Sequence, residues 1–176
     1  MTERQVFKLV KKHDGFEVRE FAPCVLAEVT VEGSLSQASS QAFGSLFSYI
    51  AKGNVDAQKI AMTAPVTATS TGGAHSQAWV VSFVMPAHLE ISNLPLPTNS
   101  SVKLRSVPAE ECAVASFRGR ADLEKWREKE AELRKMADKA GLKLSDEVRV
   151  SRFDPPFKPG LLHYNEIAIP IATGKR

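Results

Sequence analysis

The sequence has no long hydrophobic run. None of its apolar stretches approaches the ~18 residues that a membrane-spanning helix needs. The N-terminal segment MTERQVFKLVKKHDG also lacks the apolar stretch and the cleavage site of a signal peptide. These absences predict a soluble, cytoplasmic protein that does not act at a membrane.

Cysteine is scarce. Cys24 and Cys112 are the two thiols of the chain, they lie far apart in the sequence, and neither belongs to a CxxC motif. This pattern argues against a disulfide framework and against a zinc site, and it suits a reducing compartment. We expect two half-buried structural thiols.

Neither sign of charge dominates. The 23 basic and 20 acidic residues give a net charge of +3, and the two kinds are interspersed. A nucleic-acid-binding protein needs a concentrated positive surface, so no nucleic-acid partner is expected. The adjacent Lys11 and Lys12 suit a solvated terminal segment.

Motifs of common catalytic sites are missing. The sequence contains no GxSxG, no HExxH, no phosphate-binding glycine loop and no cysteine near a histidine. Glu17, Glu20, Glu28 and Glu166 are expected on strands and could meet inside a barrel, but nothing in their spacing requires it. These absences favour a protein that is not an enzyme.

The hydrophobic pattern of the first half predicts strands around a helix. Its 176 residues, 43% of them hydrophobic, suffice for one domain with a substantial core. FEVREFAPCVLAEVTVEG alternates as two strands, and SLSQASSQAFGSLFSYIAKG has helical spacing, with Ser34 or Ser36 as N-cap and Gly53 beyond the end. KIAMTAPVTATS and QAWVVSFVMP then predict two strands joined by the glycine loop TGGAH.

The second half repeats this order. SVKLRSV and CAVASFRG predict strands, a charged amphipathic helix ends at Gly141, and EVRVSRF and YNEIAIPIA predict the last strands. AEVTVEG and AVASFRG share an Ala-to-Gly pattern directly before the two helices. We therefore predict a single domain over residues 1–176 made of two similar β-β-α-β-β halves, at about 16–86 and 101–172, which form one antiparallel sheet curled toward a barrel.

The segment KIAMTAPV combines β-branched residues with a proline. On a strand, Ile60, Met62, Ala64 and Val66 would point one way, while Pro65 offers no N–H and belongs at an edge or a bulge. The sheet should be open at this point. Methionine adapts to irregular apolar surfaces, so Met62 suits a flat ligand as well as an ordinary packing strand.

Six segments of the chain resemble, in order and spacing, the SOUL family of heme-binding proteins. They are FEVREF, FGSLFSYIAKGN, KIAMTAPV, VSFVMP, PLPTNSSVKL and RFDPPFKPGLLHYNEIAI. The likeness spans nearly the whole chain, and KIAMTAPV together with DPPFKP before NEI is a specific combination. The resemblance implies an α+β fold, a distorted eight-stranded antiparallel barrel flanked by two helices, with a hydrophobic cleft that binds heme or another tetrapyrrole.

The resemblance also implies where a porphyrin would lie. In heme-binding relatives the first helix runs along the ring, which assigns Phe43, Leu46 and Phe47 to cofactor binding. Met62 is expected to project from the strand that Pro65 opens, and Lys158 of the DPPFKP loop is expected to reach a propionate. Phenylalanines four residues apart on a helix also suit an ordinary core, so both interpretations stay open.

Iron has few candidate ligands. The axial histidine proposed in one branch of the family falls at Glu20 of FEVREF. His163 is the remaining candidate because it begins the last expected strand close to Lys158, although a lone histidine is commonly a hydrogen-bonded structural residue. Heme is the expected cofactor, and metal-free porphyrin could be held by apolar contact and charge alone.

Two functions fit these observations. The first is a carrier or buffer of heme or another tetrapyrrole with no chemistry of its own. The second is a small-molecule effector-binding or protein-interaction module with no physiological heme, because the family's barrel is similar to bacterial drug-sensing domains. A DNA-binding segment would support the second function, and the sequence shows none. Protein partners are not indicated.

Overall fold

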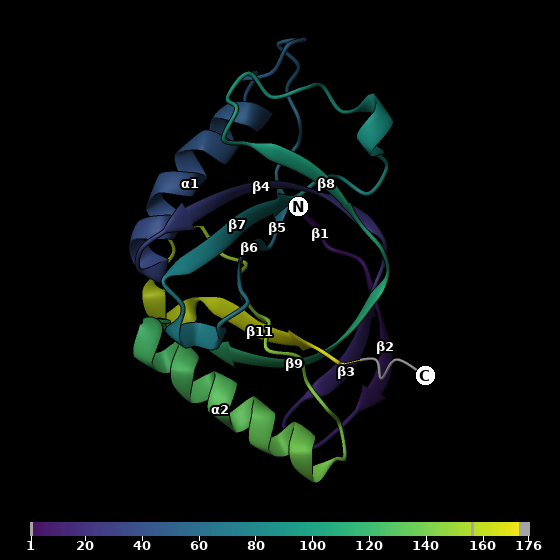
Figure 1. Ribbon diagram of the computed structural model, residues 1–176, viewed down its shortest axis with the longest axis vertical. Coiled ribbons are helices and arrows are strands. Elements are labelled where there is room, and N and C mark those ends of the chain that lie inside the picture. Colours follow the sequence, from purple (N-terminus) through teal and green to yellow (C-terminus); the bar gives the residue numbers. More distant parts are fainter. Residues whose placement is uncertain (1, 156, 173–176) are drawn as a thin grey trace.

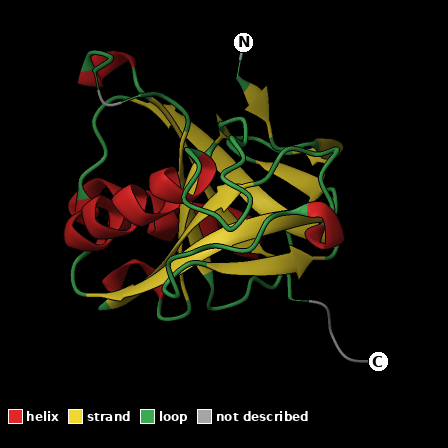
Figure 2. Cartoon of the chain, turned by 90° about the horizontal axis from the view of Figure 1, so that it is seen from above, coloured by secondary structure: helices red, strands yellow, loops and turns green. Residues whose placement is uncertain are grey.

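The fold is a strongly curled sheet with two α-helices on its outer side (Figures 1 and 2). The computed structural model describes residues 2–155 and 157–172. The strands are β1 (Glu3–Arg4), β2 (Phe7–Lys12), β3 (Glu17–Phe21), β4 (Cys24–Glu32), β5 (Thr63–Ala64), β6 (Val66–Ser70), β7 (Ala78–Val84), β8 (Lys103–Val107), β9 (Glu110–Arg118), β10 (Val148–Arg152) and β11 (Tyr164–Pro170). The α-helices are α1 (Leu35–Ile50) and α2 (Leu123–Lys139), and short 3-10 helices are η1 (Gly73–His75), η2 (Ile91–Asn93) and η3 (Gly160–Leu162).

Nine strands form one sheet in the order β2-β3-β9-β11-β10-β6-β7-β4-β8, and every neighbouring pair is antiparallel. The α+β class with two helices on a curled antiparallel sheet is thus confirmed. The sheet is an open half-barrel, since no described pairing joins β2 to β8. It has nine strands instead of eight because the segment with Lys11 and Lys12, expected to be a solvated terminus, forms the exposed edge strand β2.

When the edge strand β2 is set aside, the other eight strands are arranged symmetrically about the β6–β10 pair. On one side β6, β7 and β4 follow one another, and on the other β10, β11 and β9 do so. Strand β3 pairs with β9 of the second predicted half, and β8 pairs with β4 of the first. Each side of the sheet therefore contains strands from both halves of the chain.

The KIAMTAPV segment is interrupted rather than one continuous strand. Ile60 and Met62 lie outside any strand, β5 pairs in parallel with β1 as a separate small sheet, and β6 begins at Val66. Pro65 lies between β5 and β6, after a cis peptide bond. Proline cannot donate to a ladder, so the chain changes sheets here. The predicted opening is present, but the prediction that Ile60 and Met62 share a strand with Val66 is wrong.

Both helices begin in the same way. Gly33 and Gly119, with φ angles of 119° and 113°, turn the chain before each helix, a conformation that side chains disfavour. Ser34 and Asp122 then cap α1 and α2 by accepting a hydrogen bond from the backbone N–H three residues on, at 3.4 and 2.8 Å. Helix α1 packs on β4 and β7, and α2 on β9 and β11, so the helices cover opposite portions of one sheet.

No helix in the described part of the chain is long and apolar enough to cross a membrane.

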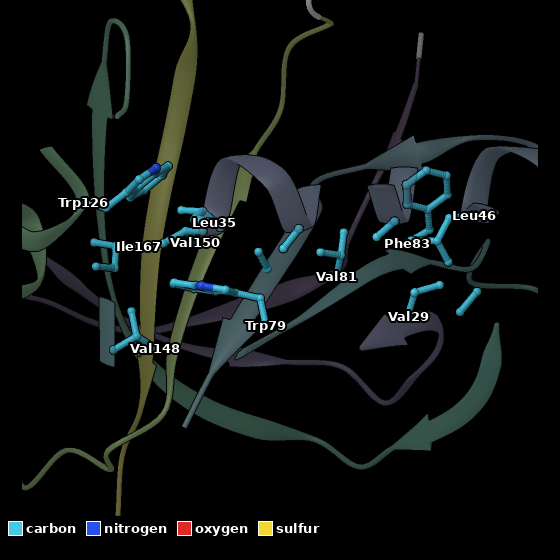
Figure 3. Packing of buried hydrophobic residues seen from close by; sticks show 14 of the residues in the cluster. Val29, Leu35, Leu46, Trp79, Val81, Phe83, Trp126, Val148, Val150 and Ile167 are labelled. Atoms are coloured by element: carbon cyan, nitrogen blue, oxygen red, sulfur yellow. The ribbon is translucent and has the colours of Figure 1, made fainter. Parts of the chain in front are cut away.

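The main core lies between the helices and the sheet. Trp79 of β7 and Trp126 of α2 are both fully buried. Figure 3 shows them together with Val150 and Ile167 of the central strands. This shared cluster joins the two predicted halves into one hydrophobic core.

The face of the sheet turned away from the helices holds a buried ion network. The Arg19 guanidinium, 7% exposed, donates to Glu17 and to Glu166 at 2.8 Å each, and the Tyr164 hydroxyl donates to Glu166 at 2.7 Å. Glu28 pairs with a different arginine at 2.7 Å. Two of the four strand carboxylates, Glu17 and Glu166, thus meet at one arginine that forms an ion pair with each.

The two cysteines are free thiols, as expected, although Cys112 is more deeply buried than predicted. Cys24 is half-buried, whereas Cys112 has no exposed surface. Burial raises the pKa of both thiols, and it raises the pKa of Cys112 to about 12. Cys112 is therefore a protonated, unreactive core residue at neutral pH.

Adjacent positions on α1 should respond very differently to truncation. We expect Leu46→Ala to lower the free energy of unfolding by about 2–5 kcal/mol, because Leu46 has no exposed surface and its loss leaves a cavity. Phe47, 49% exposed, should cost about 1 kcal/mol or less when changed to alanine. Urea denaturation of both variants measures the difference, and equal losses would contradict this account of the helix.

Candidate functional site

A groove lies between the two helices over the centre of the sheet. It consists of an apolar chamber of about 490 Å³ and a polar chamber of about 540 Å³. Leu35, Arg152 and Asp154 line both chambers, which therefore adjoin. The apolar chamber is further lined by Ser39, Ser40, Phe43, Val66, Thr67, Ala68, Val81 and Val150, and the polar chamber by Ser34, Ser36, Arg120, Ala121, Asp122, Leu123, His163, Tyr164 and Asn165.

The pairing of β6 with β10 builds the floor of the groove. In this register Val66 lies opposite Arg152, and Ala68 lies opposite Val150. Alternate residues of a strand point to the same face, so these four side chains share the face covered by the helices. The floor is apolar at its centre and ends in the guanidinium of Arg152.

Helix α1 provides an aromatic wall. The ring of Phe43 stacks on that of Phe47, with centroids 6.0 Å apart and planes at 13°, and meets Phe83 edge-on at 5.5 Å. Phe43 and Phe47 are 37% and 49% exposed. Two stacked phenylalanines thus remain open to solvent beside the groove, where an apolar ligand could cover them.

The loop from β10 to β11 is organised by Asp154. Its carboxylate accepts hydrogen bonds from Lys158 Nζ and from the backbone N–H of Tyr164, each at 2.6 Å. The Lys158 hydrogen bond and charge, with the Tyr164 N–H, lower the pKa of Asp154. His163 Nε2 lies 2.8 Å from the carbonyl oxygen of Lys158. These contacts hold one end of the polar chamber in a defined shape.

The groove brings together part of the predicted site. Phe43 lines the apolar chamber, and His163 lines the polar one. Phe47 contacts the groove through its stacking on Phe43, and Lys158 does so through its ion pair with Asp154. Neither Phe47 nor Lys158 lines a chamber itself.

Two predicted contacts lie elsewhere. Leu46 is in the core beneath α1 with no exposed surface, because it lies on the sheet-facing side of the helix. Met62 is 36% exposed in the segment before β5 and does not line the groove. The strand on which Met62 was expected does not form, since pairing in the main sheet begins only after Pro65.

Candidate iron ligands are few. The described residues contain no group of three or more His, Cys, Asp or Glu side chains that could hold a metal ion. His163 is the one histidine of residues 2–155 and 157–172 that lines the groove. If Nε2 donates to the Lys158 carbonyl, Nδ1 keeps a free lone pair. Glu20 is exposed on β3 and lies outside the groove.

Arg120 and Arg152 were missed by the sequence reasoning. Both line the polar chamber, and Arg152 also lines the apolar one. A signal for Arg152 was present, because the alternation Val148, Val150, Arg152 continues a buried face with a charged residue. Arg120 carried no comparable signal, since only the fold places the start of α2 beside the groove.

Comparison with known protein families matches residues 2–170 to the SOUL heme-binding protein family. The match spans nearly the whole chain, and the chain therefore belongs to this family. A comparison with curated proteins finds no significant match.

Solved structures with the same fold differ in what their names describe. The C-terminal domain of EcmrR has a TM-score of 0.69 at 13% identity, over 96% of this chain and 99% of that one. A hydrolase from Listeria innocua has a TM-score of 0.63 at 11% identity, over 89% and 91%. A protein bound to tetraphenylphosphonium has a TM-score of 0.54 at 12% identity, over 89% and 93%. At these identities the likeness shows the fold alone.

The hydrogen bonds of Asp154 should make the stability of the fold depend on pH. We expect Asp154→Asn to lower the free energy of unfolding by about 1–3 kcal/mol at pH 7, because the charged acceptor of Lys158 and of the Tyr164 N–H is lost. The folded pKa lies below the ordinary value of 3.8. The contribution is therefore complete above pH 3.8 and is lost as the pH falls through the folded pKa.

Denaturation of both proteins between pH 7 and pH 2 measures this difference. Asp146→Asn is the matched control, since Asp146 is an exposed carboxylate before β10. A difference between parent and Asp154→Asn that does not shrink at acidic pH would show that the carboxylate charge is not responsible.

Proposed function

We propose that this chain is a carrier or buffer that holds heme or another tetrapyrrole in the groove and performs no chemistry on it. The observation that carries the proposal is the solvent-open, stacked pair of Phe43 and Phe47 at the wall of an apolar chamber. Flat aromatic ligands gain most from such surfaces, through area burial and ring stacking. Membership of a heme-binding family supports the same ligand class.

The groove has the size and polarity that a porphyrin requires. Each chamber falls within the ~300–1,000 Å³ typical of small-molecule sites. Both chambers expose mainly apolar surface, and charged groups lie where they meet and in the polar chamber, which matches a ring with an apolar body and an acidic edge. Phe43 and Val66 would contact the ring, Phe47 would extend the wall, and Arg152 would face the acidic edge.

The residues fit the ring better than they fit its iron. His163 is the candidate axial ligand, and the Lys158 carbonyl beside Nε2 would orient its imidazole. We therefore expect apolar contact to dominate binding, with metal-free porphyrin held as well.

Catalysis receives little support from the groove. Asp154 is engaged by Lys158 and by the Tyr164 N–H, and Glu166, on the opposite face, is neutralised by Arg19. The ion pair with Lys158 holds the pKa of Asp154 below its ordinary value, which makes this carboxylate a weak general base. Binding without turnover is the function that the described side chains serve best.

An effector-binding role without physiological heme is the second candidate. It is favoured by the shared fold of the EcmrR domain and of the protein bound to tetraphenylphosphonium. The two roles differ in ligand, so hemin affinity separates them. A cytoplasmic location suits either role.

Charged substitutions on the aromatic wall should weaken hemin binding strongly. We expect Phe43→Asp and Phe47→Asp each to weaken binding about ten- to a hundredfold, because an apolar contact worth about 1.5–3 kcal/mol is replaced by a hydrated carboxylate. Lys158→Ala should weaken it only a few-fold, since a partly exposed ion pair is worth about 0–1 kcal/mol. Titration of the Soret absorbance gives the affinities.

Leu96→Asp is the matched control, because Leu96 is 66% exposed and does not line the groove. Circular dichroism must show all variants folded. Parent-like hemin binding by folded Phe43→Asp and Phe47→Asp would place the ligand elsewhere.

Iron ligation can be tested separately from ring binding. We expect hemin and protoporphyrin IX to bind with affinities within about tenfold of one another, because apolar contact dominates. We expect His163→Ala to shift the Soret band of the hemin complex and Glu20→Ala to leave it unchanged. A shift on Glu20→Ala without one on His163→Ala would place the iron beside β3, outside the groove.

A further inference from the structure

We infer that the groove selects anionic ligands, and that Arg152 and Arg120, rather than Lys158, are the cations that bind the acidic group. The inference deepens the proposed function by assigning the charge of the ligand. Its first support is position. Arg152 lies where the two chambers meet, so a ligand whose apolar body fills the apolar chamber would present its edge to this guanidinium.

Arg152 and Arg120 are the cations of the groove that form no ion pair among the described residues. Among the described residues Arg152 makes one hydrogen bond, a long contact of 3.4 Å to the carbonyl oxygen of Ala121. Most of its donors remain available to a ligand.

The carboxylates that face the groove are already satisfied. Asp154 accepts hydrogen bonds from Lys158 and from the Tyr164 N–H, and Asp122 accepts from the backbone N–H of Lys125 as the cap of α2. With the Asp154–Lys158 pair counted as neutral, Arg120 and Arg152 outweigh the charge of Asp122, so the groove keeps a net positive charge. Lys158, which the resemblance assigned to a propionate, is held by Asp154 at 2.6 Å, so its charge is already paired within the protein.

The surroundings of the two arginines favour a bound anion. Arg152 keeps an exposed side through which a ligand can reach it, while nearby protein removes enough water to lower its pKa by desolvation. A partly dehydrated guanidinium without a counter-ion is relieved by a carboxylate, which it can bind through two parallel hydrogen bonds. Arg120 lies against Gly160, where a Cβ would come within 2.6 Å of Arg120 Cγ, so this glycine leaves the space that the arginine occupies.

Tetraphenylborate and tetraphenylphosphonium test the charge preference directly, because they share a shape and differ in the sign of their charge. Calorimetry should show the parent protein binding tetraphenylborate at least about tenfold more tightly than tetraphenylphosphonium. The ratio of the two affinities, rather than either affinity, is the measurement. In Arg120→Gln/Arg152→Gln this ratio should fall by about tenfold or more.

Two matched variants complete the experiment. Lys158→Gln removes the paired cation beside the groove, and Arg105→Gln removes an arginine that pairs with Glu28 away from it. Both should keep the parent ratio, and thermal unfolding should show all variants folded. An equal or reversed preference in the parent, or a ratio unchanged in the double arginine variant, would overturn the inference.

Hemin and its dimethyl ester separate this inference from the proposed function. If the arginines bind propionates, hemin should lose at least about tenfold in affinity in the double arginine variant, and the uncharged ester should lose little. Failure of hemin to bind the parent, with the tetraphenylborate preference intact, would reject the tetrapyrrole function and keep the charge assignment. Parent-like hemin binding by the double variant would reject the assignment of the arginines to the propionates and keep the tetrapyrrole function.

Discussion

The pairing of β6 with β10 is the interaction on which the rest of the structure depends. It joins the strands β2-β3-β9-β11-β10 to the strands β6-β7-β4-β8, and without it the sheet would fall into these two parts. Val148 and Val150 are buried on its helix-facing side. A slip of one residue would turn these valines outward and bring Arg149, which binds Glu110 at 2.7 Å on the other face, into the hydrophobic core. The two faces therefore specify one register.

The groove is a consequence of that register. Because α1 and α2 cover opposite portions of the sheet, the central strands between them are left as a floor. Pairing Val66 with Arg152 then places an apolar and a cationic side chain next to each other at the edge of this floor. Pro65 lies just before Val66, where the chain passes from the small β1–β5 sheet to the main sheet. The floor of the groove therefore ends at Val66. An apolar site with a charged end thus follows from how the two halves meet.

The same fold carries proteins whose names describe a hydrolase, a C-terminal domain of EcmrR and a complex with tetraphenylphosphonium. Fold alone therefore assigns no ligand. This chain is distinguished by the side chains that line its groove. They include an exposed aromatic wall on α1 and two arginines that form no ion pair with a described carboxylate. Membership of a heme-binding family and this chemistry agree on an aromatic, acidic ligand.

The sequence by itself determined the two helices, a serine cap on the first of them, most strands, the interruption at Pro65 and the family, because these depend on local periodicity, turn chemistry and specific motifs. Only the tertiary structure decided which apolar residues face solvent. Leu46 and Phe47 are neighbours on one helix, yet packing against the sheet buries the first and leaves the second open. The sequence also could not show which cation pairs with Asp154, because an ion pair depends on the distance between side chains in the folded protein. Lys158 is compensated and Arg152 is not, because the loop folds Asp154 onto one cation and away from the other.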